Sequence, residues 1–375
     1  MGWFVWSHSD VQIVLSILII VPIFYWSSMK IFSKDLRMSI EQSLPKKKIC
    51  VILPMRNESS NVERKLSSII NEILPHDFVE LIVADSDSSD GTGEIASKFL
   101  EVSELERTRW KIRSFSIRGK NVALNRVLDE VEADIVVISD ADANVSPGWL
   151  EIVRSRMMEE DVGVVSGVEI QRGTEEGFNE YYRGKSNWLR IRESMIDSTP
   201  VLEGSILAWK TSALGQFMLN EEMNADDAQI GIFSIRCGNR SIVDDRITFE
   251  DFEQSPKRTL LESIRRSQGL SIALIKNADL AIINPRRKSR RAIRNALFLY
   301  VIFPWILLLF TLNTMLSFYS RPEIGNNWEF FSIVSIIVTL VTPQGRFLAW
   351  GSVISIVAHT QAMIGTRYNN WDPVR

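Results

Sequence analysis

The stretch ADIVVISDAD, residues 133–142, decides the fold. Its centre, Ile135–Ile138, consists of β-branched residues, which is typical of a strand that is buried on both faces of a sheet. Outward from it, short apolar runs alternate with amphipathic segments that we expect to be helices. The other predicted strands are KKICVILPM, VELIVAD, WKIRSF and VGVVSGVEI. This alternation predicts an α/β domain with a parallel sheet.

Two carboxylates, Asp140 and Asp142, end the central strand. If the strand continues through them, its period-two alternation places both on the same side. Neighbouring carboxylates repel each other unless a cation lies between them, and Mg²⁺ and Mn²⁺ prefer oxygen ligands and bridge phosphates. The pair therefore indicates a site for a divalent metal and a diphosphate. The alternative is an acidic loop that caps the helix after Pro147.

A second acidic cluster, DSDSSDGT at residues 85–92, follows the strand VELIVAD. An EF-hand loop does not fit, because the glycine stands one place late and Ala96 occupies the position of the last ligand. A phosphatase nucleophile loop fits locally but lacks a convincing second acidic loop downstream. Helix capping explains the end of the cluster but not Asp85, which we expect to accept hydrogen bonds from a nucleotide.

Three polar clusters fall at the carboxyl ends of predicted strands: Pro54–Glu58, Asp85–Thr92 and Asp140–Asn144. Ligands of α/β sheets bind beyond these strand ends. We therefore expect the three clusters to converge in space.

Three further groups have both a functional and a structural interpretation. Arg118-Gly119-Lys120 precedes a helix, where it suits a phosphate or is a solvated loop. Asp226 and Asp227 precede the helix-like AQIGIFSIRCG, where they complement the helix dipole or join the acidic clusters. The cations of residues 255–270 either lie on a membrane surface beside an apolar stripe or face a pyrophosphate.

Both ends of the chain contain long apolar runs. Residues 11–29 carry no charge and, as a helix, match the roughly 30 Å hydrocarbon core of a bilayer. Asp10 precedes this run, and Lys30, Lys34 and Arg37 follow it. The pattern favours an uncleaved anchor over a cleaved signal peptide.

Residues 296–319 form a second uncharged run. Cations stand before it, at Arg286, Arg287, Lys288, Arg290, Arg291 and Arg294. Positive charge beside a span places that side in the cytoplasm and suits anionic head groups. Residues 329–342 and 347–365 are two more apolar stretches, which form either two spans or a re-entrant hairpin.

We therefore predict an integral protein of the cell membrane with three parts: an N-terminal anchor at residues 1–33, a cytoplasmic domain at 34–285 and a basic segment with two to three spans at 286–375. A net charge of −3 over 375 residues provides no basic field, so we expect no nucleic-acid partner. Cys50 and Cys237 are the two cysteines, too few for a disulfide framework or a Cys-rich metal site.

Taken in order, the motifs resemble family 2 glycosyltransferases of the GT-A fold, in the membrane-bound branch. They are PMRNE, VADSDSSDGT, RGKNVALNRVL, SDADANVSPGWL, EGSILAWK and ADDAQIGIFSIRCGNR, between about Cys50 and Gly269. The resemblance implies an α/β nucleotide-diphospho-sugar transferase domain with flanking transmembrane helices. It also implies a UDP-sugar or GDP-sugar donor and Mn²⁺ or Mg²⁺ as cofactor.

The resemblance assigns a role to each matched position. The residues that would hold the nucleotide donor are Pro54, Arg56, Glu58, Asp85, Lys120 and Asp140. Asp140 and Asp142 would bind the metal, and Asp227 would be the catalytic base. The residues on the acceptor or diphosphate side would be Gly204, Ser205, Asp226, Arg265 and Arg266.

Two departures from the family pattern bear on the activity. Polysaccharide synthases of the family carry Gln-x-x-Arg-Trp, and the matching stretch here, Glu262–Arg266, keeps only the arginine, Arg265. Arg56 replaces the usual aromatic residue before Asn-Glu. The first departure argues against processive synthesis.

The resemblance predicts an inverting transfer of a sugar. Asp227 would deprotonate an acceptor hydroxyl, whereas a lipid phosphate is already anionic and needs no base. About four apolar segments suit a lipid or lipid-linked acceptor better than a polysaccharide channel. A processive polysaccharide synthase is the alternative enzyme, and a catalytically inactive, membrane-anchored nucleotide-binding module is the alternative of another class.

Overall fold

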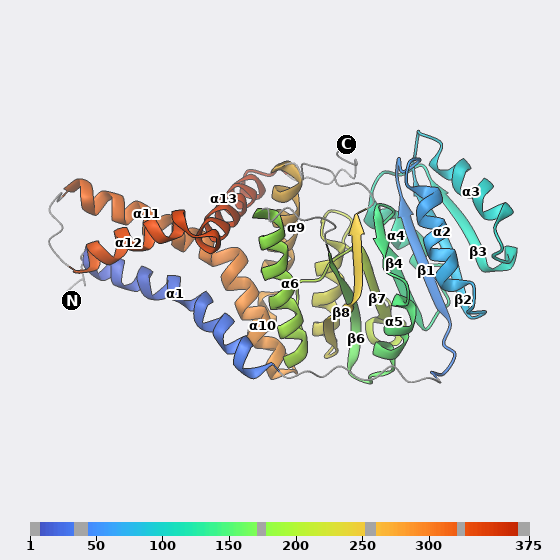
Figure 1. The fold of residues 1–375 in the computed structure, drawn as a ribbon, viewed down its shortest axis with the longest axis horizontal. Helices are drawn as coiled ribbons and strands as arrows, with labels where there is room; N and C mark the ends of the chain where they lie inside the picture. The colour runs from blue at the N-terminus through green and yellow to red at the C-terminus, as the bar shows by residue number, and fades with distance from the viewer. Residues whose placement is uncertain (1–7, 34–43, 171–177, 252–259, 321–326, 367–375) are drawn as a thin grey trace.

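The computed structural model describes residues 8–33, 44–170, 178–251, 260–320 and 327–366, and the structural statements below concern those residues. The molecule is elongated (Figure 1). An eight-stranded sheet with its helices lies at one end, and a group of apolar helices lies at the other.

The sheet is mixed, so the prediction of a parallel sheet was wrong in part. Its strands are β1 (Ile49–Met55), β2 (Val79–Ser86), β3 (Trp110–Phe115), β4 (Ile135–Ser139), β5 (Ala143–Val145), β6 (Val162–Glu169), β7 (Ile206–Lys210) and β8 (Arg240–Asp251). They lie in the order β3-β2-β1-β4-β7-β6-β8-β5. The first four in this order are parallel, but β7 is antiparallel to both its neighbours and β5 is antiparallel to β8.

A short connection accounts for the direction of β5. A parallel crossover needs about a dozen residues or more, and only residues 140–142 separate β4 from β5. β7 begins beside the end of β4, where the N–H of Asp140 donates to the carbonyl of Ser205 at 3.1 Å. The antiparallel direction of β7 therefore brings the residues before it to the carboxyl end of β4.

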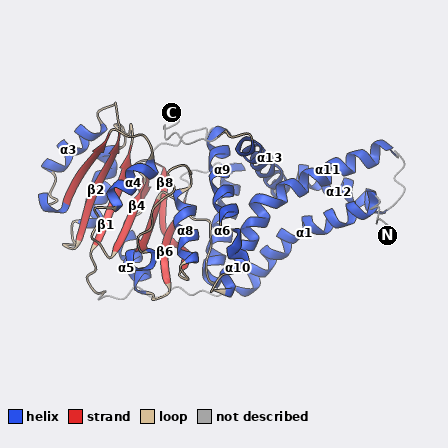
Figure 2. Ribbon diagram, turned by 180° about the vertical axis from the view of Figure 1, so that it is seen from behind, coloured by secondary structure: helices blue, strands red, loops and turns tan. Residues whose placement is uncertain are grey.

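Helices cover both faces of the central strands (Figure 2). The helices of this part are α2 (Val62–Ile73), α3 (Thr92–Val102), α4 (Lys120–Leu128), α5 (Trp149–Met158), α6 (Phe178–Ile196), α7 (Thr211–Leu214), α8 (Asp226–Arg236) and α9 (Leu260–Lys276). In β4, Val137 belongs to the apolar cluster that contains Leu66 of α2, and Ile138 to the cluster that contains Leu124 of α4. Burial on both faces explains why β4 shows no apolar–polar alternation.

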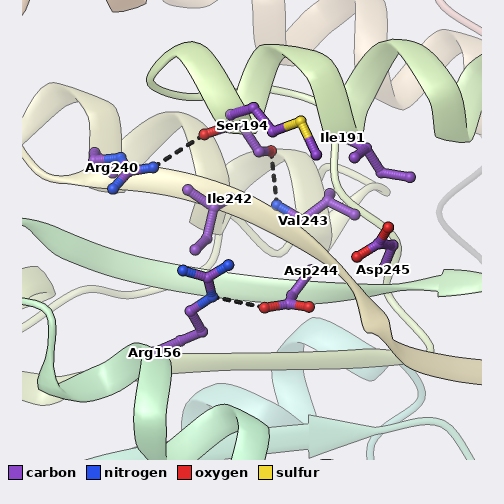
Figure 3. Close-up of a pocket in the computed structure, with 9 residues that line it drawn as sticks. Arg156, Ile191, Ser194, Arg240, Ile242, Val243, Asp244 and Asp245 are labelled. Atoms are coloured by element: carbon purple, nitrogen blue, oxygen red, sulfur yellow. Dashed lines mark hydrogen bonds and ion pairs between the residues drawn. The ribbon is translucent and has the colours of Figure 1, made fainter. Parts of the chain in front are cut away.

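The helix α6 lies between the sheet and the apolar helices and is attached to β8 (Figure 1). Arg240 donates to the carbonyl of Ser194 at 3.0 Å, and the Ser194 hydroxyl accepts from the N–H of Val243 at 2.8 Å (Figure 3). Beside them, Arg156 pairs with Asp244 at 2.6 Å. Because Arg156 and Asp244 neutralise each other, we interpret the pocket in Figure 3 as a structural junction rather than a ligand site.

The helices at this end are the apolar α1 (His8–Phe32), α11 (Phe303–Ser320), α12 (Asn327–Val341) and α13 (Pro343–Met363), and the basic α10 (Arg287–Leu297). Among the described residues, two continuous helices are long and apolar enough to cross a membrane: Asp10–Phe32, and Arg287–Ser317, in which α10 and α11 join through a π-helical turn. The pair α12 and α13 bends by 92° at a short break, which is the geometry of a broken span or a re-entrant loop.

Gly167 provides a test of the packing of β6 against β8. A Cβ atom at this position would lie 2.5 Å from the carbonyl oxygen of Ile247, which belongs to the backbone of β8. We expect Gly167→Ala to lower the free energy of unfolding by about 1–3 kcal/mol, because the strands must move apart. Thermal and urea unfolding of the protein in detergent, followed by tryptophan fluorescence, would measure the change.

Gly184 is the matched control, because a Cβ atom there would meet no atom within 4 Å. It lies in α6, where Gly→Ala stabilises a helix by about 0.5–1 kcal/mol. Equal effects of Gly167→Ala and Gly184→Ala would contradict the close contact between β6 and β8.

Candidate active site

Two of the predicted polar clusters meet at the carboxyl ends of β1 and β2. The N–H of Asn57 donates to the hydroxyl of Ser88 at 3.0 Å, and the N–H of Glu58 donates to the hydroxyl of Thr92 at 2.8 Å. Asn57 adopts a φ of 53°, so the chain turns sharply there. These contacts join Pro54–Glu58 to the loop after β2.

Arg56 and Asp85 are buried at this edge, with 4% and 8% of their surfaces exposed. Burial raises the pKa of Asp85, and a hydrogen bond from Ser88 opposes that shift. Within the part of the chain that the structure describes, Oδ1 of Asp85 is buried and accepts no hydrogen bond. Since buried oxygens rarely stay without a donor, this atom suits an N–H or O–H group of a ligand.

A lysine and three carboxylates gather beside these loops. Lys120, the first residue of α4, places its Nζ 2.7 Å from Oδ1 of Asp140 and 2.9 Å from Oδ2 of Asp226. Gly204 closes the group, because a Cβ atom there would lie 3.8 Å from Cβ of Asp227 and 3.9 Å from both Oδ2 of Asp140 and Nζ of Lys120. Segments from four places in the sequence therefore converge at this point.

The charges of this group perturb one another. Burial and the neighbouring charge of Asp226 raise the pKa of Asp227 to about 7. Burial also raises the pKa of Asp140, against the opposing effect of Lys120. Burial alone would lower the pKa of Lys120, but the carboxylates of Asp140 and Asp226 outweigh burial and raise it. Lys120 is therefore a stable cation, and Asp227 titrates near neutral pH.

Asp140 and Asp142 fit a divalent cation that is shared with a diphosphate. Asp142 is exposed and Asp140 is partly buried, and both offer the hard oxygen ligands that Mg²⁺ and Mn²⁺ prefer. Among the described residues, no group of three or more His, Cys, Asp or Glu side chains could hold a metal by itself. Two carboxylates leave positions on such a cation for the oxygens of a bound phosphate or for water.

The helix α9 crosses the start of α8. A Cβ atom on Gly269 would lie 2.9 Å from the carbonyl oxygen of Asn224, so α8 and α9 approach closely there. Arg266 is half-exposed and pairs with Glu262 at 2.8 Å. These two residues stand where polysaccharide synthases have their tryptophan and glutamine, and they form an ion pair instead.

The positive charge of Arg266 also interacts with carboxylates of the acidic group. Burial lowers its pKa, but Glu262, Glu203, Asp227 and Asp142 outweigh burial and raise it. For Arg265, burial and the charge of Arg266 lower the pKa.

The opposite side of α9 contacts α13. The hydroxyls of Ser267 and Ser355 lie 3.2 Å apart, and Nε2 of His359 lies 2.9 Å from the hydroxyl of Ser271. The helix that carries Arg266 therefore also contacts one of the apolar helices. Residues 255–259 of the predicted segment lie outside the described residues.

Two further cations lie near the site, one whose role the sequence left open and one that it did not single out. Arg118 is an exposed residue that pairs with Asp87 at 3.0 Å, as expected for the solvated loop. Lys65, which the sequence analysis missed, is 0% exposed and donates to the hydroxyl of Ser139 at 2.7 Å and to the carbonyl of Ala143 at 2.6 Å. Its position on the apolar stripe of α2, with Leu66 at the next residue, was the available signal.

Comparison with known proteins bears on the family and the fold of this domain. Residues 50–222 match the sequence model of glycosyl transferase family 2. A solved mannosyltransferase from Pyrobaculum calidifontis, in complex with GDP-Man and Mn²⁺, superposes with a TM-score of 0.77 over 95% of this chain and 99% of its own, at 23% identity. That likeness establishes the fold.

Two curated relatives match part of the domain. The β-monoglucosyldiacylglycerol synthase of Trichormus variabilis is 27% identical over 121 residues, which are 31% of this chain and 25% of the relative. The dolichol-phosphate mannosyltransferase of Pyrococcus furiosus is 34% identical over 104 residues, 27% of each chain. The matched segments thus span about a quarter of either relative. The family match and the shared fold lead to one conclusion: residues 50–222 belong to glycosyl transferase family 2, and the chain carries a glycosyltransferase domain of the GT-A fold.

Proposed function

We propose that this protein is a membrane-bound, metal-dependent inverting glycosyltransferase of the hexosyl type. It transfers a sugar from a nucleotide-diphosphate sugar to a lipid or lipid-linked acceptor. The observation that carries the proposal is the convergence of Lys120, Asp140 and Asp227 around Gly204. The ammonium group of Lys120, which would bind phosphate, lies in one small site with Asp227, whose pKa is raised to about 7.

The donor nucleotide would lie along the ends of β1 and β2. Oδ1 of Asp85 is available there for a donor group of the base or ribose. Lys120 would contact the diphosphate, and Asp140 and Asp142 would hold Mn²⁺ or Mg²⁺. The metal, when bound, neutralises charge on the leaving diphosphate. The Mn²⁺ and GDP-Man in the solved mannosyltransferase support a donor and a cofactor of this kind.

The transfer is a single displacement. The acceptor oxygen attacks the anomeric carbon, a new C–O bond forms, and the bond from that carbon to the diphosphate oxygen breaks with its electron pair. Asp227 accepts the proton of an acceptor hydroxyl. Lys120 and Arg266 stabilise the charge that develops on the departing diphosphate. Attack from the face opposite the diphosphate inverts the anomeric centre.

A lipid acceptor is supported by the contact between the site and the apolar helices. The helix α9 carries Arg266 on one side and contacts α13 on the other. A lipid held at the surface of these helices would reach Asp227 along α9. The two curated relatives carry a diacylglycerol and a dolichol phosphate in their names, which supports the same class of acceptor.

In this proposal the chain has three parts: an anchor at residues 1–33, a catalytic domain at 34–285 and a membrane region at 286–375. In the basic stretch, Arg286 pairs with Asp161 at 3.0 Å and with Asp197 at 2.8 Å. Other cations of this stretch, Arg287, Lys288 and Arg294, stay exposed. Positive charge beside a membrane helix is typical of the cytoplasmic side. It supports a protein of the cell membrane whose catalytic domain lies in the cytoplasm.

Nucleotide release tests the proposed reaction. The purified protein in detergent is offered UDP- and GDP-sugars, Mn²⁺ or Mg²⁺, and a total lipid extract. With a hydroxyl acceptor, Asp227→Asn should lower turnover about 10²- to 10⁴-fold, because the proton acceptor is lost. Asp142→Asn should abolish metal-dependent nucleotide binding and release together.

The matched control is Asp77→Asn, since this exposed carboxylate pairs only with Lys46 among the contacts described for it. Loss of release in Asp142→Asn but not in Asp227→Asn would identify a lipid phosphate as acceptor. Tight metal-dependent UDP or GDP binding without release of nucleotide from any donor would refute the enzyme and favour the binding module.

The pH dependence of the reaction should report the ionisation of Asp227. Its pKa is raised to about 7, so it is protonated and inactive as a base below that pH. With a hydroxyl acceptor, kcat/KM should fall about tenfold per pH unit below this value. Asp226→Asn removes the adjacent negative charge, so the pKa of Asp227 should fall and the acidic limb should move to lower pH.

Profiles of kcat/KM against pH for wild type and Asp226→Asn provide the measurement. Donor binding measured over the same pH range separates loss of the base from loss of the nucleotide. An acidic limb that stays in place in the variant would exclude Asp227 as the titrating group.

A further inference from the structure

Lys65 is a fully buried cation directly beneath the candidate donor site. It lies on the face of α2 that packs against the sheet, and 0% of its surface is exposed. Burying an ammonium group is costly unless its protons find acceptors. Nζ of Lys65 donates to Oγ of Ser139 at 2.7 Å and to the carbonyl oxygen of Ala143 at 2.6 Å.

These two acceptors stand on either side of the Asp140-Ala141-Asp142 triplet. Ser139 is the last residue of β4, and Ala143 is the first residue of β5. One ammonium group therefore joins both ends of the turn that carries the two carboxylates.

The contact continues from the turn to the acceptor side of the site. The hydroxyl of Ser139 donates to the carbonyl oxygen of Ser205 at 2.9 Å, and the N–H of Asp140 donates to the same oxygen at 3.1 Å. Lys65 is thus hydrogen-bonded to Ser139, and Ser139 is hydrogen-bonded to Ser205, the residue after Gly204.

We propose that Lys65 is a positioning residue of the donor site: it fixes the turn at Asp140–Asp142 in the geometry that binds the metal and diphosphate. The inference rests on the proposed function. Lysine suits the position because its long stem crosses the apolar interior and its ammonium carries several donors. Methionine would occupy similar volume and supply no donor.

A charge effect and a positioning effect of Lys65 predict opposite results. The positive charge repels a divalent cation at Asp140 and Asp142, so charge alone predicts that Lys65→Met tightens metal binding. Positioning predicts weaker binding, because both hydrogen bonds that hold the turn disappear. Loss of groups that orient metal ligands typically weakens metal binding about 10- to 100-fold.

The experiment uses the full chain in detergent and Mn²⁺ with UDP, and separately with GDP. Calorimetry and thermal shift measure the Mn²⁺ concentration at half-saturation. In Lys65→Met we expect this concentration to rise about tenfold or more. Hydrogen exchange should be faster in the amides of residues 139–145. Lys65→Met should also raise the apparent KM for Mn²⁺ more than it lowers kcat at saturating Mn²⁺.

Lys210 provides a matched control. It is also a buried lysine with carbonyl acceptors, because its Nζ donates to the backbone of Glu159 at 2.7 Å and of Glu160 at 3.1 Å. These contacts lie at the opposite end of the sheet from the triplet. We expect Lys210→Met to lower stability but to leave the Mn²⁺ half-saturation and the exchange of residues 139–145 unchanged.

An unchanged or lower Mn²⁺ half-saturation in Lys65→Met overturns the inference. If Lys65→Met does not fold, Ser139→Ala provides the test instead. This variant removes one acceptor of Lys65, so it should raise the Mn²⁺ concentration at half-saturation by a smaller factor. Wild-type protein that binds nucleotide with Mn²⁺ but transfers no sugar refutes the proposed function alone. In that case the measurements of metal and nucleotide binding still test the positioning role of Lys65.

Discussion

The ammonium group of Lys120 lies between two carboxylates that are far apart along the chain. It is 2.7 Å from Asp140 at the end of β4 and 2.9 Å from Asp226 at the start of α8. Several carboxylates gathered in a half-buried space repel one another and lose the favourable hydration of their charges. A cation between them makes the arrangement stable, so the ends of β4, α4 and α8 are held at one point. The proposed chemistry depends on this contact.

The rest of the fold brings the other groups of the site close to Lys120. β4 is buried on both faces, and Asp140 follows its last residue, Ser139. β7 runs antiparallel to β4, which brings Gly204 to the same edge. A Cβ atom on Gly204 would lie at ordinary contact distance from Asp227, Asp140 and Lys120, so its backbone forms a wall of the site. A parallel strand at the position of β7 would begin at the opposite edge and would remove this wall of the site.

The apolar helices are connected to the site through α9. Gly269 allows α9 to approach the start of α8, and Ser271 contacts His359 of α13 on the other side. A shift of α13 would therefore move the helix that carries Arg266. This connection between α13 and α9 follows from helix packing rather than from any motif.

The sequence by itself determined the central strands and the polar residues at their ends, because apolar runs and strand-end motifs are local patterns. It also determined the two helices that are long and apolar enough to cross a membrane. Only the tertiary structure decided the antiparallel direction of β7, the burial of Lys65 under the turn and the contact of Lys120 with Asp226. Each of these depends on contacts between residues that are distant in sequence. Such contacts are set by how faces pack together, and a local pattern does not encode which faces will meet.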